Sequence, residues 1–205
     1  MANTKLLLLC GVIGSPLFVV VFSILSVIRP GYDPWRQNVS SLEIGELGWV
    51  QIANFIVTGL LFCAFAIGLR RALSPTGARW QPLLLGLVGL GLIGAGLFAP
   101  DRHPLLHDIC SAPVFFGLIA ACLAFAWLFF EHSTGAWATY SLLTAVGVLT
   151  ALVLSALGFG QHPLFVDFAG LWQRVSIITG WSWIMLLAIG ALRSRFELPT
   201  QVGTR

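Results

Sequence analysis

Residues 6–28 read LLLLCGVIGSPLFVVVFSILSVI, an apolar run without a charged side chain. A helix rises about 1.5 Å per residue, so about 20 such residues cross the roughly 30 Å hydrocarbon layer of a bilayer. The run is also longer than the apolar segment of a cleavable signal peptide. We therefore interpret it as an uncleaved first membrane span.

Five more apolar runs follow, separated by breaks rich in proline, glycine and charged residues. The predicted spans lie near 6–28, 49–69, 82–99, 109–130, 138–159 and 168–192. Segments of this length satisfy their backbone hydrogen bonds in hydrocarbon as helices, and the short alternating strands of a membrane barrel are absent from the pattern. The sequence predicts an all-α membrane protein, a six-transmembrane-helix bundle forming a single integral membrane domain over residues 1–205.

The composition agrees with lipid as the solvent and leaves no room for a soluble domain. Hydrophobic residues make up 58% of the chain and charged residues 9%, and the mean hydropathy is +0.91. The basic residues are scattered at predicted helix ends and form no run that could neutralise phosphates, so we expect no nucleic-acid partner. The four cysteines show no C-x-x-C spacing, and we expect no disulfide framework.

The distribution of basic residues predicts the orientation in the membrane. One side would carry Lys5, Arg70, Arg71, Arg79, Arg193, Arg195 and Arg205, and the other Arg29, Arg36 and Arg102. Because cytoplasmic loops carry the excess of Lys and Arg, this pattern predicts both termini in the cytoplasm. We expect a multi-pass protein of the cell inner (plasma) membrane.

Two features concern the arrangement of the predicted spans. The third span is rich in glycine, which lets helix backbones approach closely and favours a central place in the bundle. The breaks after the third and fifth spans share a pattern, HPLLHD at residues 103–108 and HPLFVD at residues 162–167. This echo suggests a bundle assembled from three helical hairpins.

Polar side chains gather on the predicted extracytoplasmic side, where ionisable groups at membrane depth indicate a site or an internal pair. The candidate ligand-binding residues are Asp33, Arg36, Gln51, Asn54, Gln173 and Arg174. Arg174 lies deepest in its span, so we expect it to face the bundle and pair with an anion such as Asp33, Asp108 or Asp167. It would serve as a structural ion pair or as a planar fork of donors that binds an anionic ligand.

Three histidines on the same side form a candidate metal site. His103 and His107 are four residues apart, which stacks them on one helix face, and His162 would complete a shell suited to zinc or another divalent metal. Asp108 or Asp167 would then be the candidate catalytic base. The competing interpretation is structural, because Pro104 and Pro163 suit first helical positions and a following acid complements the helix dipole.

Short motifs along the chain resemble a known family. They are Gly31-Tyr32-Asp33-Pro34, Ser40-Ser41-Leu42, Gly48-Trp49, Asn54-Phe55 with Gly59, the turn with Asp101 and His107, and Gln173-Arg174. Together these resemble the prokaryotic six-span membrane family catalogued as domain of unknown function 998, over nearly the whole chain. The resemblance implies the six-helix fold and directs attention to Asp33, His107 and Arg174, but it implies no chemistry.

Three functions are consistent with these patterns. The first is an extracytoplasmic-facing polar pocket that binds a small or lipidic ligand. The second is a metal-dependent membrane hydrolase acting on a lipid or amphiphile at the outer leaflet. The third, a small transporter, is disfavoured because most predicted spans lack ionisable residues near the middle of the bilayer, where transport sites lie. The predicted partners are the lipid bilayer and, for a binding pocket, a lipid or small-molecule ligand. The sequence does not indicate an oligomeric state.

Overall fold

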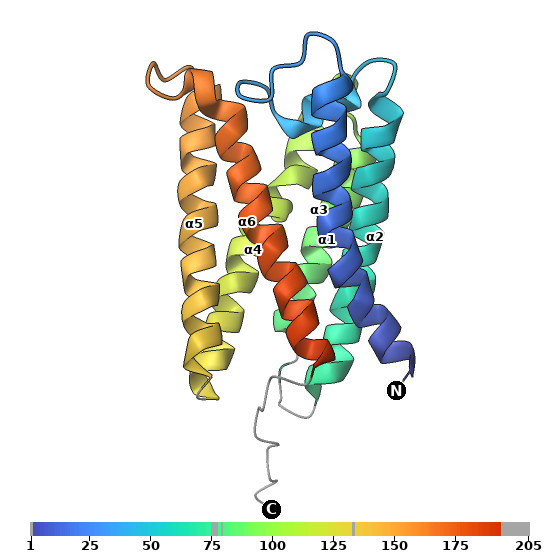
Figure 1. Cartoon of the computed structure of the whole chain (residues 1–205), viewed down its shortest axis with the longest axis vertical. Coiled ribbons are helices and arrows are strands. Elements are labelled where there is room, and N and C mark those ends of the chain that lie inside the picture. The colour runs from blue at the N-terminus through green and yellow to red at the C-terminus, as the bar shows by residue number, and fades with distance from the viewer. Residues whose placement is uncertain (1, 75–77, 79, 133, 194–205) are drawn as a thin grey trace, which may run out of the picture.

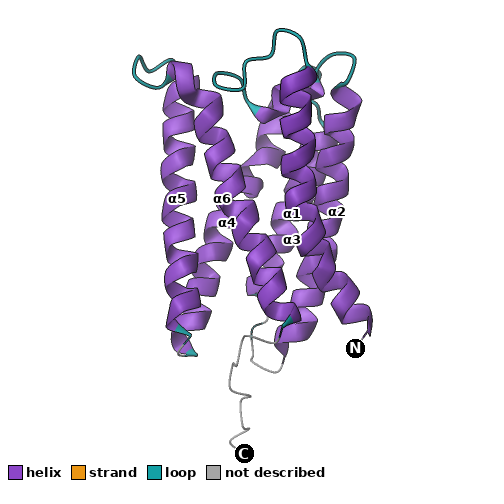
Figure 2. Ribbon diagram, viewed as in Figure 1, coloured by secondary structure: helices purple, strands orange, loops and turns teal. Residues whose placement is uncertain are grey.

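The computed structural model describes residues 2–74, 78, 80–132 and 134–193, and within these ranges it contains helices and loops but no strand. The long helices, shown in Figures 1 and 2, are α1 (Ala2–Ile28), α2 (Gly48–Leu73), α3 (Gln81–Leu97), α4 (Pro104–Glu131), α5 (Gly135–Phe159) and α6 (Ala169–Leu192). Two short 3₁₀ turns, η1 (Val39–Glu43) and η3 (Val166–Phe168), lie in the connections. The predicted all-helical fold class is confirmed for the described residues.

Five of these helices are long and apolar enough to cross a membrane. The sixth, α3, has 17 residues and therefore a length of about 26 Å, slightly less than the hydrocarbon thickness. Large apolar side chains also cover the outside of the bundle, as expected of a surface that faces lipid. Examples that are more than half exposed are Ile13, Val20, Leu60, Leu90, Phe116 and Leu143. The chain is a membrane protein.

The helices form a closed ring. Each packs against its neighbours in the chain, and α6 returns to pack against α1. The start of α1 and the end of α6 lie at the same end of the bundle (Figure 1). The opposite end, here called the loop end, carries residues 29–47, 98–103 and 160–168, which connect α1 to α2, α3 to α4 and α5 to α6.

Glycines set the close approach of α3 to its neighbours. A Cβ atom on Gly59 of α2 would lie 2.5 Å from the carbonyl oxygen of Gly89 in α3, and one on Gly91 would lie 2.8 Å from that of Cys110 in α4. The small residues therefore act as predicted, by allowing backbone contact. The expected central place of α3 is wrong, however, because α3 packs between α2 and α4 as one member of the ring.

Aromatic side chains fill the middle of the ring. Trp181 of α6 lies with its ring centroid 5.5 Å from those of Phe18 and Phe62, which joins α6 to α1 and α2. Two residues further from the loop end, Trp183 packs edge-on against Phe125, and its indole donates a hydrogen bond to Ser141 Oγ at 3.0 Å. These contacts fix the rotation of α6, and with it the direction of every polar side chain near its start.

The two HPL-containing breaks have different structures. His103 precedes α4, with Pro104 at the first helical position, so the first break is a helix start as the structural interpretation predicted. Pro163 lies in an irregular turn, and Asp167 lies in η3 just before α6. The sequence echo therefore does not correspond to equivalent structure.

Candidate functional site

Arg174 lies on the second turn of α6, is buried, and is surrounded by oxygen atoms of the α1–α2 connection. Its Nη1 donates to the carbonyl oxygens of Pro34 at 2.7 Å, Gln37 at 2.9 Å and Gly170 at 3.0 Å. Its Nη2 donates to Ser26 Oγ at 3.4 Å and to the Tyr32 hydroxyl. The guanidinium also lies 5.5 Å from the ring centroid of Tyr32, within the range of a cation–π contact.

The anion expected beside Arg174 is not found among the described residues, and the predicted pairing with Asp33, Asp108 or Asp167 is wrong. Carbonyl dipoles and aromatic faces stabilise the charge in place of a carboxylate. Arginine suits this role because its guanidinium presents several donors in a fixed plane. The residue therefore anchors the connection between α1 and α2 to α6.

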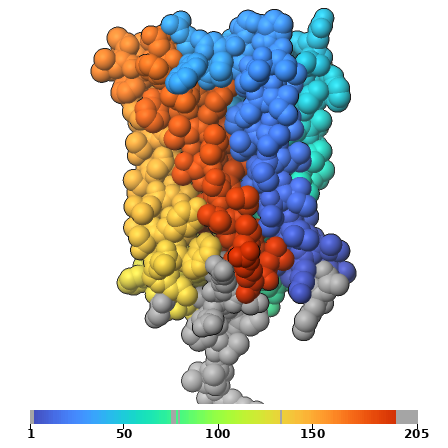
Figure 3. Space-filling view, viewed as in Figure 1, coloured from blue at the N-terminus to red at the C-terminus, as the bar shows by residue number. Residues whose placement is uncertain are grey.

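Gly170 makes this anchoring possible. A Cβ atom there would lie 2.3 Å from the carbonyl oxygen of Gln37, so only glycine lets the connection touch the α6 backbone. Two further hydrogen bonds hold the same surfaces together. Leu171 N donates to the carbonyl of Trp35 at 3.0 Å, and Gln173 Oε1 accepts from Val39 N at 2.8 Å. Figure 3 shows the light-blue connection lying against the orange start of α6.

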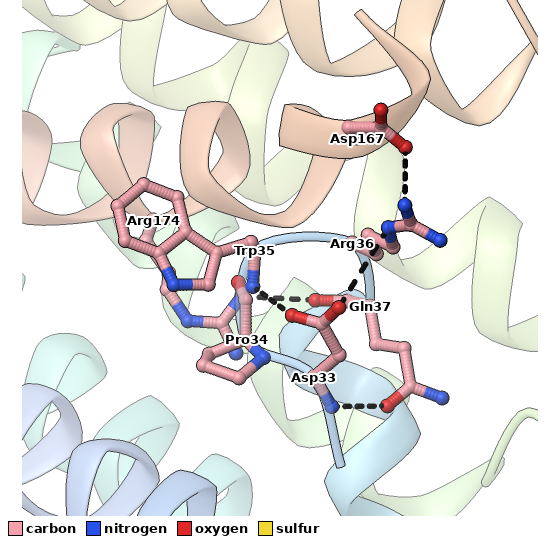
Figure 4. Close-up of polar contacts among 7 residues, drawn as sticks. All are labelled: Asp33, Pro34, Trp35, Arg36, Gln37, Asp167 and Arg174. Atoms are coloured by element: carbon pink, nitrogen blue, oxygen red, sulfur yellow. Dashed lines mark hydrogen bonds and ion pairs between the residues drawn. The ribbon is translucent and has the colours of Figure 1, made fainter.

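Asp33 and Arg36 form a second, more exposed group on the same connection. Asp33 Oδ1 accepts from Trp35 N at 2.9 Å and closes a tight turn. Arg36 lies between two carboxylates, 3.7 Å from Asp33 and 2.7 Å from Asp167 (Figure 4). This exposed ion pair links the α1–α2 connection to the α5–α6 connection.

Gln51 and Asn54 lie inside the ring near the start of α2. Asn54 Nδ2 donates to the carbonyl of Phe18 at 3.2 Å, which joins α2 to α1, and to Gln51 Oε1 of its own helix at 3.3 Å. Gln51 Nε2 and Asn54 Oδ1 are buried without a hydrogen-bond partner in the described part of the chain. Asn54 therefore makes a polar contact between helices, whereas the hydrogen bond of Gln51 lies within α2.

The three candidate metal ligands lie in different surroundings. His103 is exposed and stacks edge-on against Phe98, whereas His162 lies in the α5–α6 connection against Phe165. His107 is buried, and its Nδ1 makes hydrogen bonds of 3.1 and 3.0 Å with the carbonyls of Ala95 and Phe98. Within the residues that the structure describes, no three His, Cys, Asp or Glu side chains form a group that could hold a metal ion.

A cavity of about 240 Å³ lies beneath η1 and is lined by residues of all six long helices. The lining side chains nearest the loop end are mainly polar. These are Asn38, Ser40, His107, Asp108, Ser111 and Gln173. Further along the helices the lining is apolar or aromatic, with Phe18, Phe55, Leu92, Val114, Phe115, Ile177 and Trp181. Val39 and Phe159 add apolar side chains at the loop end.

The hydrogen bonds of His107 define what its ring offers to this cavity. Nδ1 faces two carbonyl oxygens, which accept hydrogen bonds only, so Nδ1 carries the proton. In the neutral ring Nε2 is then the nitrogen left to accept a hydrogen bond. Trp181 lines the same cavity, and its buried indole N–H has no acceptor among the described residues.

The structure therefore divides the predicted site. His107, Asp108 and Gln173 line the cavity, whereas the other candidate residues do not. Trp181 and Asn38 also line it, and the sequence analysis did not select them. The i, i+4 spacing of His107 and Ser111 on one helix face was the available signal for Ser111. No comparable pattern indicates Trp181, because it lies in an apolar span.

Comparison with known proteins identifies a family but no characterised relative. The model of a family described as protein of unknown function, DUF998, matches residues 12–190 of the chain. The match includes all the residues that line the cavity and that anchor the α1–α2 connection. No curated protein and no solved structure matches the chain.

Proposed function

The chain belongs to the DUF998 family of proteins of unknown function, and from this premise we propose that it binds a small or lipidic ligand in the cavity beneath η1. In this proposal all six helices span the cell inner membrane, both termini are cytoplasmic, and the loop end faces outward. Lys5, Arg70, Arg71 and Arg193, at the opposite end from the loop end, support this orientation.

The observation that carries the proposal is the composition of the cavity. Hydroxyl, amide, imidazole and carboxyl side chains line the cavity near the loop end, and apolar and aromatic side chains line its floor. This division between a polar and an apolar part suits an amphiphilic ligand. The indole N–H of Trp181 is a buried donor without an acceptor, and leaving such a donor unpaired is costly. An acceptor on the ligand would satisfy it at the floor of the cavity.

The roof of the cavity and its attachment to α6 also support the proposal. Asn38, Val39 and Ser40 form this roof, and Arg174, Gly170 and Gln173 hold it against α6. We assign Arg174 a positioning role, because its donors are already occupied by carbonyl and hydroxyl oxygens. No observation of the described residues favours the metal-dependent hydrolase or the transporter.

Filling the cavity tests the proposal. Ser111→Leu adds an apolar side chain to the cavity wall, and the additional volume displaces a ligand because the cavity is small. Ser23→Leu makes the same chemical change on an exposed position of α1 and is the matched control. Native mass spectrometry from lipid nanodiscs would measure the small molecule or lipid that remains bound.

We expect wild type and Ser23→Leu to retain a defined bound mass, and Ser111→Leu to retain at least about tenfold less, a difference of roughly 1.4 kcal/mol in binding. Equal retention by Ser111→Leu and Ser23→Leu would contradict the assignment of the cavity. A wild-type protein without any bound mass would contradict it as well.

A further inference from the structure

Glu43, the last residue of η1, is a buried acid without a hydrogen-bond partner. The residue is 4% exposed, and neither Oε1 nor Oε2 has a donor within the described residues. An ionised carboxylate in such a place is strongly disfavoured unless a positive charge lies beside it. Glu43 is therefore stable as a neutral acid or as the counter-charge of a cation.

Glu43 lines a second cavity, of about 430 Å³, which shares no residue with the cavity beneath η1. It lies at the loop end, between the α1–α2 connection, the start of α2 and the α3–α4 connection. Two further carboxyl groups, those of Glu46 and Asp101, line it, together with the indole of Trp49. The basic residues along its wall are Arg102 and His103.

The remaining charged neighbour of η1 is Arg29, which donates from Nη1 to the carbonyl of Ser41. No ion pair between Glu43 and Arg29, Arg102 or His103 exists among the described residues. The three acids therefore outnumber the two basic residues of the wall, of which one is a histidine. The cavity is complementary to a positively charged ligand.

We propose that this second cavity binds a primary ammonium group, with Glu43 as its counter-charge. An ammonium group has three donors for the carboxyl oxygens, and the face of Trp49 attracts a cation. Among the described residues, these carboxyl groups do not form a group that could hold a metal ion. The volume of the cavity suits a small organic cation. The ammonium group can belong to a free amine or to the headgroup of an aminolipid.

Proton exchange at Glu43 gives this site a characteristic pH dependence. Burial, with a smaller contribution from Asp101, raises the pKa of Glu43 to about 8 from an ordinary value of 4.5. Below pH 8 the acid holds its proton in the empty site, and an ammonium group must displace that proton to bind. Affinity therefore rises with pH, by about tenfold per unit where Glu43 is protonated, and levels off above pH 8.

Isothermal titration calorimetry of the purified full chain in a neutral detergent tests the site, with ethanolamine as the probe at constant ionic strength. Ethanolamine stays charged between pH 6 and 8, since alkylamines titrate near 10. We expect binding that strengthens across this range and releases a proton, which is measured by comparing buffers of different ionisation enthalpy.

Glu43→Gln keeps the shape of the protonated acid but cannot become a counter-charge. We expect it to fold, to bind ethanolamine at least about tenfold more weakly, and to lose the pH dependence. Glu131→Gln is the matched control, because Glu131 is an exposed acid at the far end of α4. It should bind ethanolamine as wild type does, and circular dichroism would verify the helix content of both variants.

Three results would overturn the proposal. The first is a Glu43→Gln variant that binds ethanolamine with wild-type affinity, and the second is a wild-type protein that binds sodium ions as tightly as ethanolamine. The third is a wild-type protein that does not bind ethanolamine at concentrations up to about 10 mM. Nanodiscs containing phosphatidylethanolamine then distinguish the two sources. Retention of this lipid that depends on Glu43 identifies the headgroup, and retention that is independent of Glu43 identifies the free amine.

Discussion

At the scale of single residues, Arg174 shows how a buried guanidinium is stabilised without a carboxylate. The carbonyl oxygens of Pro34 and Gln37 are free to accept because they belong to a connection and not to a helix. Tyr32 adds a hydroxyl oxygen and an aromatic face. The result is a rigid junction between the α1–α2 connection and α6.

Replacing this buried arginine should be far more costly than replacing the exposed arginine beside it. Arg174→Met leaves buried carbonyl oxygens without donors, so we expect it to destabilise the protein by roughly 2–4 kcal/mol. Arg36→Met removes an ion pair whose side chains are 61% and 55% exposed, and should cost less than about 1 kcal/mol. Thermal unfolding in detergent measures both, and equal losses would show that Arg174 is not the anchor.

The sequence could predict that Arg174 faces the interior, because a charged side chain inside an apolar span has no other acceptable direction. It could not predict the partners. Every residue has a backbone carbonyl, so the sequence carries no signal for which carbonyls a loop will present. The expectation of a carboxylate partner was wrong for this reason.

At the scale of the helices, the contact between α2 and α3 depends on glycine at specific positions. Gly59→Ala would place a Cβ atom 2.5 Å from the backbone oxygen of Gly89, so the helices must separate, at a cost of roughly 1–3 kcal/mol. Gly86→Ala is the matched control on the same pair of helices. Its Cβ atom would lie 3.7 Å from that of Ala66, an ordinary contact, and it should change stability by less than about 1 kcal/mol.

The same thermal unfolding measurement distinguishes these alanine variants. A lower midpoint for Gly59→Ala with an unchanged or higher midpoint for Gly86→Ala is the expected result. Equal midpoints would mean that backbone contact does not hold α2 and α3 together.

The positions of the helices were largely predictable, because long apolar runs leave a membrane chain few alternatives. The fourth helix is the instructive exception. It begins at Pro104, whereas the prediction placed its start near 109, because His107 and Asp108 look like part of a polar break. In the structure His107 Nδ1 is hydrogen-bonded to carbonyl oxygens at the end of α3, so this polar nitrogen has partners inside the bundle.

At the scale of the whole molecule, the candidate site depends on two quantities that hydropathy does not contain. One is the rotation of each helix about its axis, which the packing of Trp181 and Phe18 sets for α6 and α1. The other is the path of the α1–α2 connection, which places Asn38 and Ser40 over the ring. The sequence predicted which end of the bundle is polar. It could not predict which polar residues anchor the α1–α2 connection, which line the cavity and which lie on the surface.

The proposed six-span topology requires α3 to cross the membrane with 17 residues, fewer than any of the other five long helices has. If α3 does cross, residues on its two sides face opposite compartments. Single cysteines introduced as Ser74→Cys and Arg102→Cys flank α3 at exposed positions, and Gln161→Cys marks the α5–α6 connection. A cysteine-free background removes the native thiols.

In intact cells a membrane-impermeant maleimide should label Arg102→Cys and Gln161→Cys, because both lie at the proposed outward-facing loop end. Ser74→Cys should react only after the membrane is permeabilised. Labelling of Ser74→Cys and Arg102→Cys from the same side would show that α3 does not span. Labelling of Ser74→Cys alone in intact cells would reverse the proposed orientation, and the cavity beneath η1 would then open toward the cytoplasm.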